Sequence, residues 1–246
     1  MRGGYQPAGF PGNLDGAVVR ELERLEAPPA RLPLSLTHRR RFSRLLHMPT
    51  LELDRIVRCV EYDPLLAISV LRLIATELAD LDPVRISDCI IIAGRERLVA
   101  LAETQNCAIT SLPSIEKFAE HARSFSLIAS RLAASTGAVD PAAARLAGLL
   151  HFLGELPVLL SGCSLDDYSP AAIAGWGERL ATSWHLPAAF ISAIAAYDVC
   201  ACGSTPDAMQ SVIVAARGLA DWPDETAPAA VLLSEGENEA TRWQTV

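Results

Sequence analysis

Histidines, cysteines and carboxylates are the side chains of this sequence that could hold a metal ion or transfer a proton. The histidines are far apart in the chain: His38, His47, His121, His151 and His185. Cys200 and Cys202 form a close pair, but a zinc site needs four ligands, and no second pair lies nearby. Asp166 and Asp167 lack the contrasting surroundings that acid–base catalysis needs. We therefore expect no catalytic residue, metal or cofactor at these positions, only thiols and a solvated turn.

Charge is distributed unevenly between the two halves of the chain. Residues 1–123 contain 16 basic and 16 acidic side chains, whereas residues 124–246 contain 5 and 13, so the second half accounts for the net charge of −8. Because an acidic surface repels phosphate groups, this argues against nucleic acid as a partner. The basic cluster at residues 38–44 (HRRRFSR) is interpreted as the solvated face of a helix. Nucleic-acid binding through the arginines of this cluster, Arg39, Arg40, Arg41 and Arg44, stays open as a third hypothesis.

The composition is that of a protein with a sizeable core and no membrane span. Half of the 246 residues are hydrophobic. The most apolar run, residues 146–163, is interrupted by His151, Glu155 and Pro157, and a span needs ~18–20 apolar residues. The N-terminus lacks the apolar stretch of a secretory signal. We therefore expect a cytoplasmic protein without membrane contact.

The pattern of caps and apolar residues predicts helices throughout. A capping residue precedes a proline at Asp63-Pro64, Asp140-Pro141, Ser169-Pro170 and Thr205-Pro206. Thr50 is expected to cap a helix over 51–60, and Ser114 a long helix that ends at Gly137. Residues 89–92 could form a buried strand, but without a partner strand we predict a helix. No segment alternates as strands do, so the predicted class is all-α.

Four apolar segments carry further motifs, and their order is more specific than any one of them. Residues 62–75 (YDPLLAISVLRLIA) are similar to Asp-Pro-x-Leu-x-x-x-x-Leu-Arg-Leu-Ala, and residues 86–98 (ISDCIIIAGRERL) to Ile-Ser-x-x-x-x-Ala-Ile-x-x-Leu-Gly. Residues 147–155 (AGLLHFLGE) are similar to Ala-Gly-Leu-Leu-His-Asp-Ile-Gly-Lys, and residues 183–194 (SWHLPAAFISAI) to Trp-Gly-Leu-Pro-x-x-Ile-x-x-Ala-Ile. In this order they resemble the HDOD domain (HD-related output domain) of bacterial signalling proteins, over about residues 32–220.

The resemblance implies a two-lobed helical bundle whose C-terminal lobe is related to HD phosphohydrolases. Catalytic members of that superfamily hold a divalent ion with histidines and a His-Asp pair, which generates a hydroxide nucleophile. Here Phe152 stands at the position of the Asp, and Ser124 stands near that of a first histidine. Ala172-Ile173 and Tyr197 replace further ligand positions. The resemblance thus implies a degenerate site, a possible pocket, at Ser124, His151, Phe152, Ile173, Trp184 and Tyr197.

We expect four regions along the chain and one main function. The regions are a flexible tail over 1–30 with at most a short helix at 14–25, a helical lobe over 31–113, an HD-like lobe over 114–223 and an acidic tail over 224–246. The predicted function is a non-catalytic HDOD-type signalling or regulatory module that binds another protein. The alternative is a divergent metal-dependent phosphohydrolase acting on nucleotides, with ligands from His121, His151, Asp198 and the Cys200/Cys202 pair.

Overall fold

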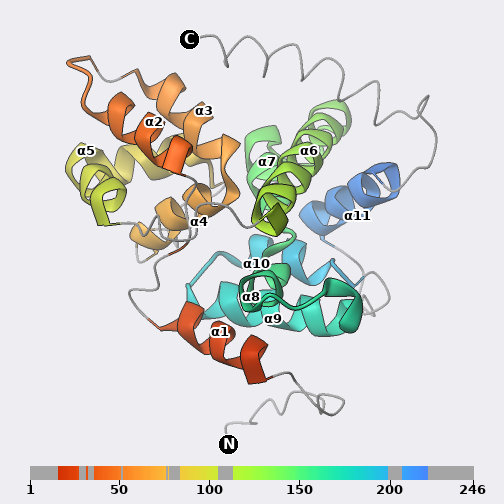
Figure 1. Ribbon diagram of the computed structural model, residues 1–246. Coiled ribbons are helices and arrows are strands. Elements are labelled where there is room, and N and C mark those ends of the chain that lie inside the picture. The colour runs from red at the N-terminus through yellow and green to blue at the C-terminus, as the bar shows by residue number, and fades with distance from the viewer. Residues whose placement is uncertain are drawn as a thin grey trace, which may run out of the picture.

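The computed structural model describes residues 16–27, 32, 36–50, 52–75, 77, 84–104, 113–198 and 207–220. Within these residues every regular element is a helix, which confirms the predicted all-α class (Figure 1). The α-helices are α1 (Gly16–Glu26), α2 (Leu36–Leu46), α3 (Leu53–Tyr62), α4 (Pro64–Leu73), α5 (Ile86–Thr104), α6 (Pro113–Thr136), α7 (Pro141–Leu150), α8 (Leu156–Ser161), α9 (Pro170–Ser183), α10 (Ala188–Ala195) and α11 (Ala208–Ala220). Short 3₁₀ helices, η2 (Leu153–Glu155) and η3 (Leu165–Asp167), lie between α7 and α9.

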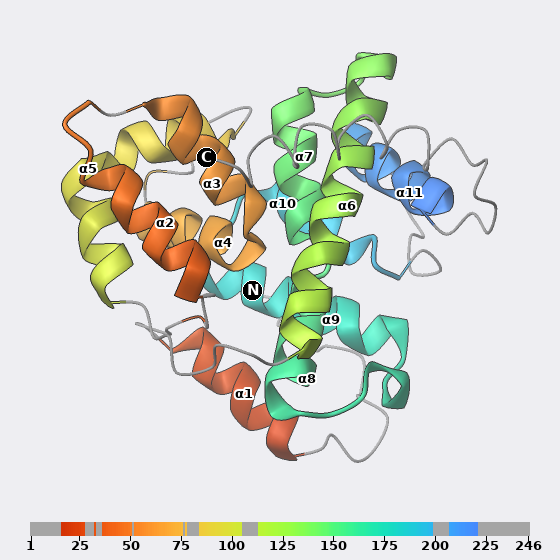
Figure 2. The same cartoon turned by 45° about the horizontal axis from the view of Figure 1, so that its top comes forward.

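The helices gather into two lobes, α2–α5 and α6–α11, which lie side by side in Figure 2. Helix α4 is the centre of the first lobe, because every residue from Pro64 to Leu71 is buried. It packs against α3 and α5. Asp63 caps α4 by accepting hydrogen bonds from the backbone N–H groups of Leu65 and Leu66, at 2.9 and 3.3 Å. The Nδ1 atom of His38 on α2 lies 2.9 Å from the other oxygen of this carboxylate and ties α2 to the cap.

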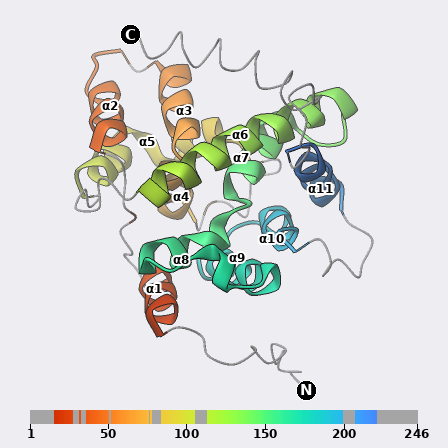
Figure 3. The same cartoon turned by 45° about the vertical axis from the view of Figure 1, so that its right-hand side comes forward.

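Helices α6 and α7 form the most extensive helix pair of the second lobe. Figure 3 shows them on one side of the group formed by α8, α9 and α10. The turn after α7 packs very closely on α9, since a Cβ on Gly154 would overlap the backbone carbonyl of Ile173. A Cβ on Gly177 would lie 2.5 Å from the side chain of Ile194. Two glycines therefore let η2, α9 and α10 approach one another, and this fixes the chain that follows His151.

Helix α1 docks on the second lobe, although its sequence lies in the stretch interpreted as a flexible tail. Its buried residues, Val18, Leu22 and Leu25, follow helical spacing and pack against α8 and α9. The indole N–H of Trp184 donates to the carbonyl of Leu25 at 3.0 Å. The short helix considered for residues 14–25 is thus present at Gly16–Glu26. A narrow apolar stripe is enough to dock this helix. The glycines and prolines around it therefore do not indicate a flexible tail over residues 16–27.

Arginine side chains join the two lobes. The contacts are Arg85 with Asp140 (2.6 Å), Arg145 with Glu61 (3.4 Å), Arg123 with the carbonyl of Tyr62 (3.2 Å), and Arg72 over the ring of Trp184 (4.6 Å). The Arg85 guanidinium, through its hydrogen bond, lowers the pKa of Asp140 below its ordinary value. Asp140 also caps α7, so one carboxylate serves both the helix and the lobe contact.

Most helix boundaries follow the predicted signals. Asp63, Asp140 and Ser169 each accept backbone hydrogen bonds at the start of a helix. The long helix ends before Gly137, which has a positive φ of 64°, and residues 89–92 are helical. The Thr50 prediction was wrong, because α3 begins at Leu53 after Glu52, and no side chain caps it. The Ser114 prediction was also wrong, because α6 begins at Pro113 and Ser114 therefore lies inside the helix. The signal at Thr205-Pro206 and the acidic tail from residue 224 lie outside the described residues.

The stretch Pro141–Ser161 is long and apolar enough to cross a membrane by composition alone. It is the only such stretch among the residues described, and 89% of its most apolar window is buried inside the protein. The chain turns within it at His151, where α7 ends and η2 follows. These are the properties of a core segment.

Candidate functional site

His151 lies at the end of α7, in the middle of the second lobe, and its exposed fraction is 0%. The ring of Phe125, from α6, stacks on the imidazole with centroids 4.9 Å apart. Phe152, the next residue in the chain, meets the same ring edge-on at 4.8 Å. Two phenyl rings therefore shield the imidazole from water.

Hydrogen bonds determine which nitrogen of His151 carries the proton. Nδ1 lies 2.7 Å from the backbone carbonyl oxygen of Ala193 on α10. Since a carbonyl oxygen only accepts, Nδ1 carries the hydrogen and Nε2 presents its lone pair. Nε2 lies 3.4 Å from an Nη1 atom of Arg217, on α11, which can donate to it. The imidazole is thus held between α10 and α11 as a neutral ring.

The surroundings keep His151 neutral well below physiological pH. Burial lowers the pKa of His151 to about 4, and the positive charges of Arg217 and His121 act in the same direction. The hydrogen bond to Ala193 opposes this shift but does not reverse it.

Phe152 occupies the space between two histidines. Its ring centroid lies 4.2 Å from that of His121 and 4.8 Å from that of His151, and the side chain is 3% exposed. Phe125 and Tyr197 contact it at 5.1 and 6.1 Å. A phenyl ring offers no oxygen or nitrogen, so the side chain between the two imidazoles cannot bind an ion.

Tyr197, Glu155 and Arg217 complete one side of this cluster. The Tyr197 hydroxyl donates to a carboxylate oxygen of Glu155 at 2.9 Å. Arg217 lies over the Tyr197 ring at 4.7 Å and donates to the backbone carbonyl of Tyr197 at 3.2 Å. Burial raises the pKa of Glu155, and it also raises the pKa of Tyr197, next to the Glu155 carboxylate. We call His121, Phe125, His151, Phe152, Glu155, Tyr197 and Arg217 the aromatic cluster.

The donor set of the aromatic cluster does not fit a divalent ion. Such an ion needs several nitrogen or oxygen ligands around one point. Here a guanidinium faces the free nitrogen of His151, and Phe152 separates the two imidazoles. Among the residues that the structure describes, no group of three His, Cys, Asp or Glu side chains could hold a metal ion. Cys200 and Cys202 lie outside this part of the chain.

The structure unites some of the predicted site residues and separates others. His151, Phe152 and Tyr197 belong to the aromatic cluster. Ser124 lies on α6 beside Phe125, and it is Phe125 that supplies the ring against His151. Ile173 packs with its carbonyl against Gly154, and Trp184 contacts α1 and Arg72 at the junction of the lobes.

Sequence reasoning missed two members of the cluster, Phe125 and Arg217, although both had a signal. Phe125 lies four residues after His121 on one helix, so the two share a face. Arg217 is a single charge in an otherwise apolar helix, and such a residue commonly has a buried partner.

The structure also describes the paired carboxylates and some of the cysteines. Asp166 and Asp167 lie exposed on η3. Cys59 and Cys89 are buried free thiols, and burial raises the pKa of each to about 12.

Comparisons with known proteins match this architecture. Crystal structures of the MmoQ response regulator from Methylococcus capsulatus str. Bath share its fold. One, of a fragment, has 17% identity and a TM-score of 0.57, and covers 78% of this chain and 84% of that one. A second has 18% identity and a TM-score of 0.57, covering 79% and 88%. None of the curated proteins searched matches the chain. The model of the HDOD domain matches residues 32–165, more than half of the sequence, and the chain therefore belongs to the HDOD domain family.

Proposed function

We propose that this chain is a non-catalytic signalling or regulatory module of the cytoplasm that acts by binding another protein. The observation that carries the proposal is Phe152, a buried ring that lies between His121 and His151. Hydrolysis by an HD-type site requires a carboxylate oxygen on the ion at this position, because the ion must be held there to generate hydroxide. An aromatic ring offers no such ligand.

Arg217 supports the same proposal from the opposite side of His151. A guanidinium stays protonated at any physiological pH, and it is 3.4 Å from the only nitrogen of His151 that could bind a metal. An incoming divalent ion would meet a fixed positive charge. The alternative phosphohydrolase needs both His121 and His151 as ligands of one ion, and the contacts of both rings with Phe152 argue against it.

Phe152 fills the position inside the lobe where a ligand of the ion would lie. We therefore expect the lobe to act through its surfaces. A protein that transmits a signal without chemistry does so through contacts whose strength differs between partners or states. The MmoQ structures are described as those of a response regulator, which is a signalling protein of the same fold. This favours a signalling role for the present chain.

Metal content and hydrolysis test the non-catalytic part of the proposal. The purified full chain is incubated with Mn²⁺, Fe²⁺ or Zn²⁺, desalted and analysed by mass spectrometry for metal, and is assayed for hydrolysis of nucleotides and bis(p-nitrophenyl) phosphate. We expect far less than one ion per chain and no turnover. The comparison variant Phe152→Asp/Arg217→Ala places a carboxylate between two imidazoles and removes the opposing cation, so it should bind more metal. One ion per wild-type chain, lost in His151→Asn, would overturn the proposal.

Capture experiments test the partner class. Immobilised full chain is exposed to an extract of the source organism with and without nuclease, and bound material is identified by mass spectrometry. The proposal expects a protein partner that persists after nuclease treatment, whereas recovery of nucleic acid alone contradicts it.

A further inference from the structure

Helix α1 packs against α8 and α9 of the second lobe, although the chain continues from it to α2 in the first lobe. Figure 3 shows it beside α8. Its buried side chains, Val18, Leu22 and Leu25, are at most 2% exposed, and their spacing of i, i+4 and i+7 places them on one face. Arg20 and Glu23, on the opposite face, are exposed. The surface of α8 and α9 therefore receives an amphipathic helix.

The second lobe also contacts the C-terminal end of this helix. The carbonyl of Leu25 cannot be paired by the next turn of the backbone, because Pro28-Pro29 lacks the N–H groups that would donate to it. The indole N–H of Trp184 donates to it instead, at 3.0 Å. The Arg179 guanidinium contacts both carboxylate oxygens of Glu26, with Nη2 at 2.7 Å from Oε2. An N–H donor and a cation at this end suit the negative pole of a helix and determine the direction in which it binds.

We infer that α8, α9 and Trp184 form a binding site for an amphipathic helix of a partner protein, and that α1 is the occupant that the chain itself supplies. We call this surface the helix-binding face. The helix that fits has apolar side chains at i, i+4 and i+7 and a carboxylate at i+8, as in α1. A helix bound in a groove is a common mode of protein recognition, and its anchors follow this spacing. The inference rests on the proposed function, because it names the surface through which such a module binds its partner.

The attachment of α1 is weak enough for exchange. A helix of 11 residues is marginally stable by itself in water, so α1 keeps its structure through its contacts with the second lobe. It buries three apolar side chains, and its ion pair between Arg179 and Glu26 is partly exposed and therefore weak. The covalent connection gives α1 an effective concentration in the millimolar range. A partner helix that is already folded avoids the cost of ordering, and this allows it to compete with α1.

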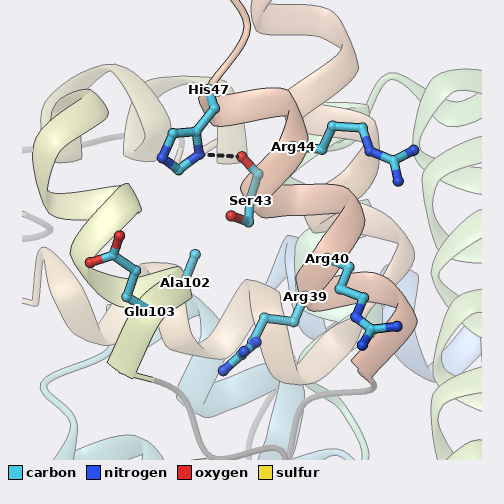
Figure 4. Close-up of a pocket in the computed structure, with 7 residues that line it drawn as sticks. All are labelled: Arg39, Arg40, Ser43, Arg44, His47, Ala102 and Glu103. Atoms are coloured by element: carbon cyan, nitrogen blue, oxygen red, sulfur yellow. Dashed lines mark hydrogen bonds between the residues drawn. The ribbon is translucent and has the colours of Figure 1, made fainter.

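The pocket of the first lobe lacks the properties of a helix-binding surface. It has a volume of about 390 Å³ and lies between α2 and the end of α5 (Figure 4). Apart from Ala102, its lining residues are charged or polar, as Figure 4 shows for Arg39, Ser43 and Glu103. It has no apolar stripe that a helix could cover, so the first lobe provides the control for the experiment.

Binding of an α1 peptide to the full chain tests the helix-binding face. The variant Val18→Asp/Leu22→Asp removes the apolar stripe of α1 and leaves the face free. A fluorescein-labelled peptide of residues 14–27 is titrated with each protein and followed by fluorescence anisotropy. We expect the variant to bind this peptide at least about tenfold more tightly than wild type, whose own α1 competes. The same peptide with Leu22→Asp should bind the variant at least about tenfold more weakly, because it loses a buried side chain.

Two arginines provide a matched pair of charge controls. Arg179→Ala, added to the variant, should weaken peptide binding about threefold, because it removes the partner of Glu26. Arg40→Ala removes an exposed arginine of α2 and should leave the binding unchanged. Circular dichroism verifies that each protein is folded. A folded Val18→Asp/Leu22→Asp chain that does not bind the peptide would overturn the inference.

Hydrogen exchange in the wild-type chain provides a test that needs no variant. If α1 exchanges with a partner helix, it must open without unfolding of the lobe. Its amide hydrogens should therefore exchange at least about tenfold faster than those of α7. Equal rates in α1 and α7 would mean that α1 leaves the face only when the whole lobe unfolds, which contradicts the inference.

Capture from an extract of the source organism separates this inference from the proposed function. The Val18→Asp/Leu22→Asp chain should retain about fivefold more of the partner protein than wild type, and excess α1 peptide should release it. A partner retained equally by both chains and not released by the peptide supports the proposed function and refutes the helix-binding face. Peptide binding without any captured protein would contradict the proposed function and leave the face as a docking site for α1 alone. A wild-type dimer that the peptide dissociates would assign the face to a second copy of the chain and replace the inference.

Discussion

The buried imidazole of His151 should make the protein less stable as the pH falls from about 6.5 to 4. Burial lowers the pKa of His151 to about 4, whereas in an unfolded chain it is near its ordinary value of about 6.5. Between these values the unfolded state binds a proton that the folded state does not. The free energy of unfolding therefore falls on acidification, by about 1.4 kcal/mol per pH unit and about 3 kcal/mol in total.

Neighbouring groups change how steeply the free energy of unfolding depends on pH, but they do not change the contribution of His151. Arg217 and His121 face the imidazole and favour its neutral form. Burial raises the pKa of Glu155, so this group acts in the opposite direction, and the stability it contributes is lost as the pH rises through its folded pKa. A difference between two variants removes these shared effects. His151→Asn keeps an N–H donor for Ala193 and does not titrate.

Urea unfolding followed by circular dichroism at pH 7.5 and 4.5 measures this difference. Wild type should lose about 2–3 kcal/mol more than His151→Asn over this interval. His47 is an exposed histidine of α2, so His47→Asn should follow wild type. Equal losses for wild type and His151→Asn would refute a buried, neutral imidazole.

Three further outcomes follow from the packing. Gly177→Ala should destabilise the protein by about 1–3 kcal/mol, since its Cβ would crowd α10 and η2, whereas Gly175→Ala, with open space in the same helix, should stabilise it by about 0.5–1 kcal/mol; chemical denaturation compares them. Trp184→Phe removes the hydrogen bond to α1 and should lower the free energy of unfolding by about 1–2 kcal/mol, with faster proteolysis within α1. Cys59 and Cys89 should resist iodoacetamide at pH 8 in the folded protein and react after unfolding, as peptide mapping can show.

The fold could be predicted from the sequence where a local signal determines the structure. Asp63 and Asp140 each precede a proline, and each caps the helix that follows. Such signals depend only on adjacent residues, so they can be recognised without knowledge of the tertiary structure. Helix α1 shows the limit, because the docking of Leu22 and Leu25 depends on α8 and α9, more than a hundred residues away.

The site was partly predictable for the same reason. The motif around His151 is contiguous, so Phe152 could be identified as the departure from an acidic residue. The position of Arg217 could not, because it depends on how α11 packs on α6 and α7 after a long stretch of chain. Trp184 was grouped with His151 because of the order of the motifs in the sequence, whereas its indole N–H donates to the carbonyl of Leu25 on α1.

The aromatic cluster joins the helices that an ion would otherwise have to bridge. Phe125 connects α6 to His151, the bond to Ala193 connects α10, and Arg217 connects α11 through both His151 and Tyr197. Ring packing and a permanent cation therefore link these helices. Substitutions in the cluster should consequently change the stability of the protein.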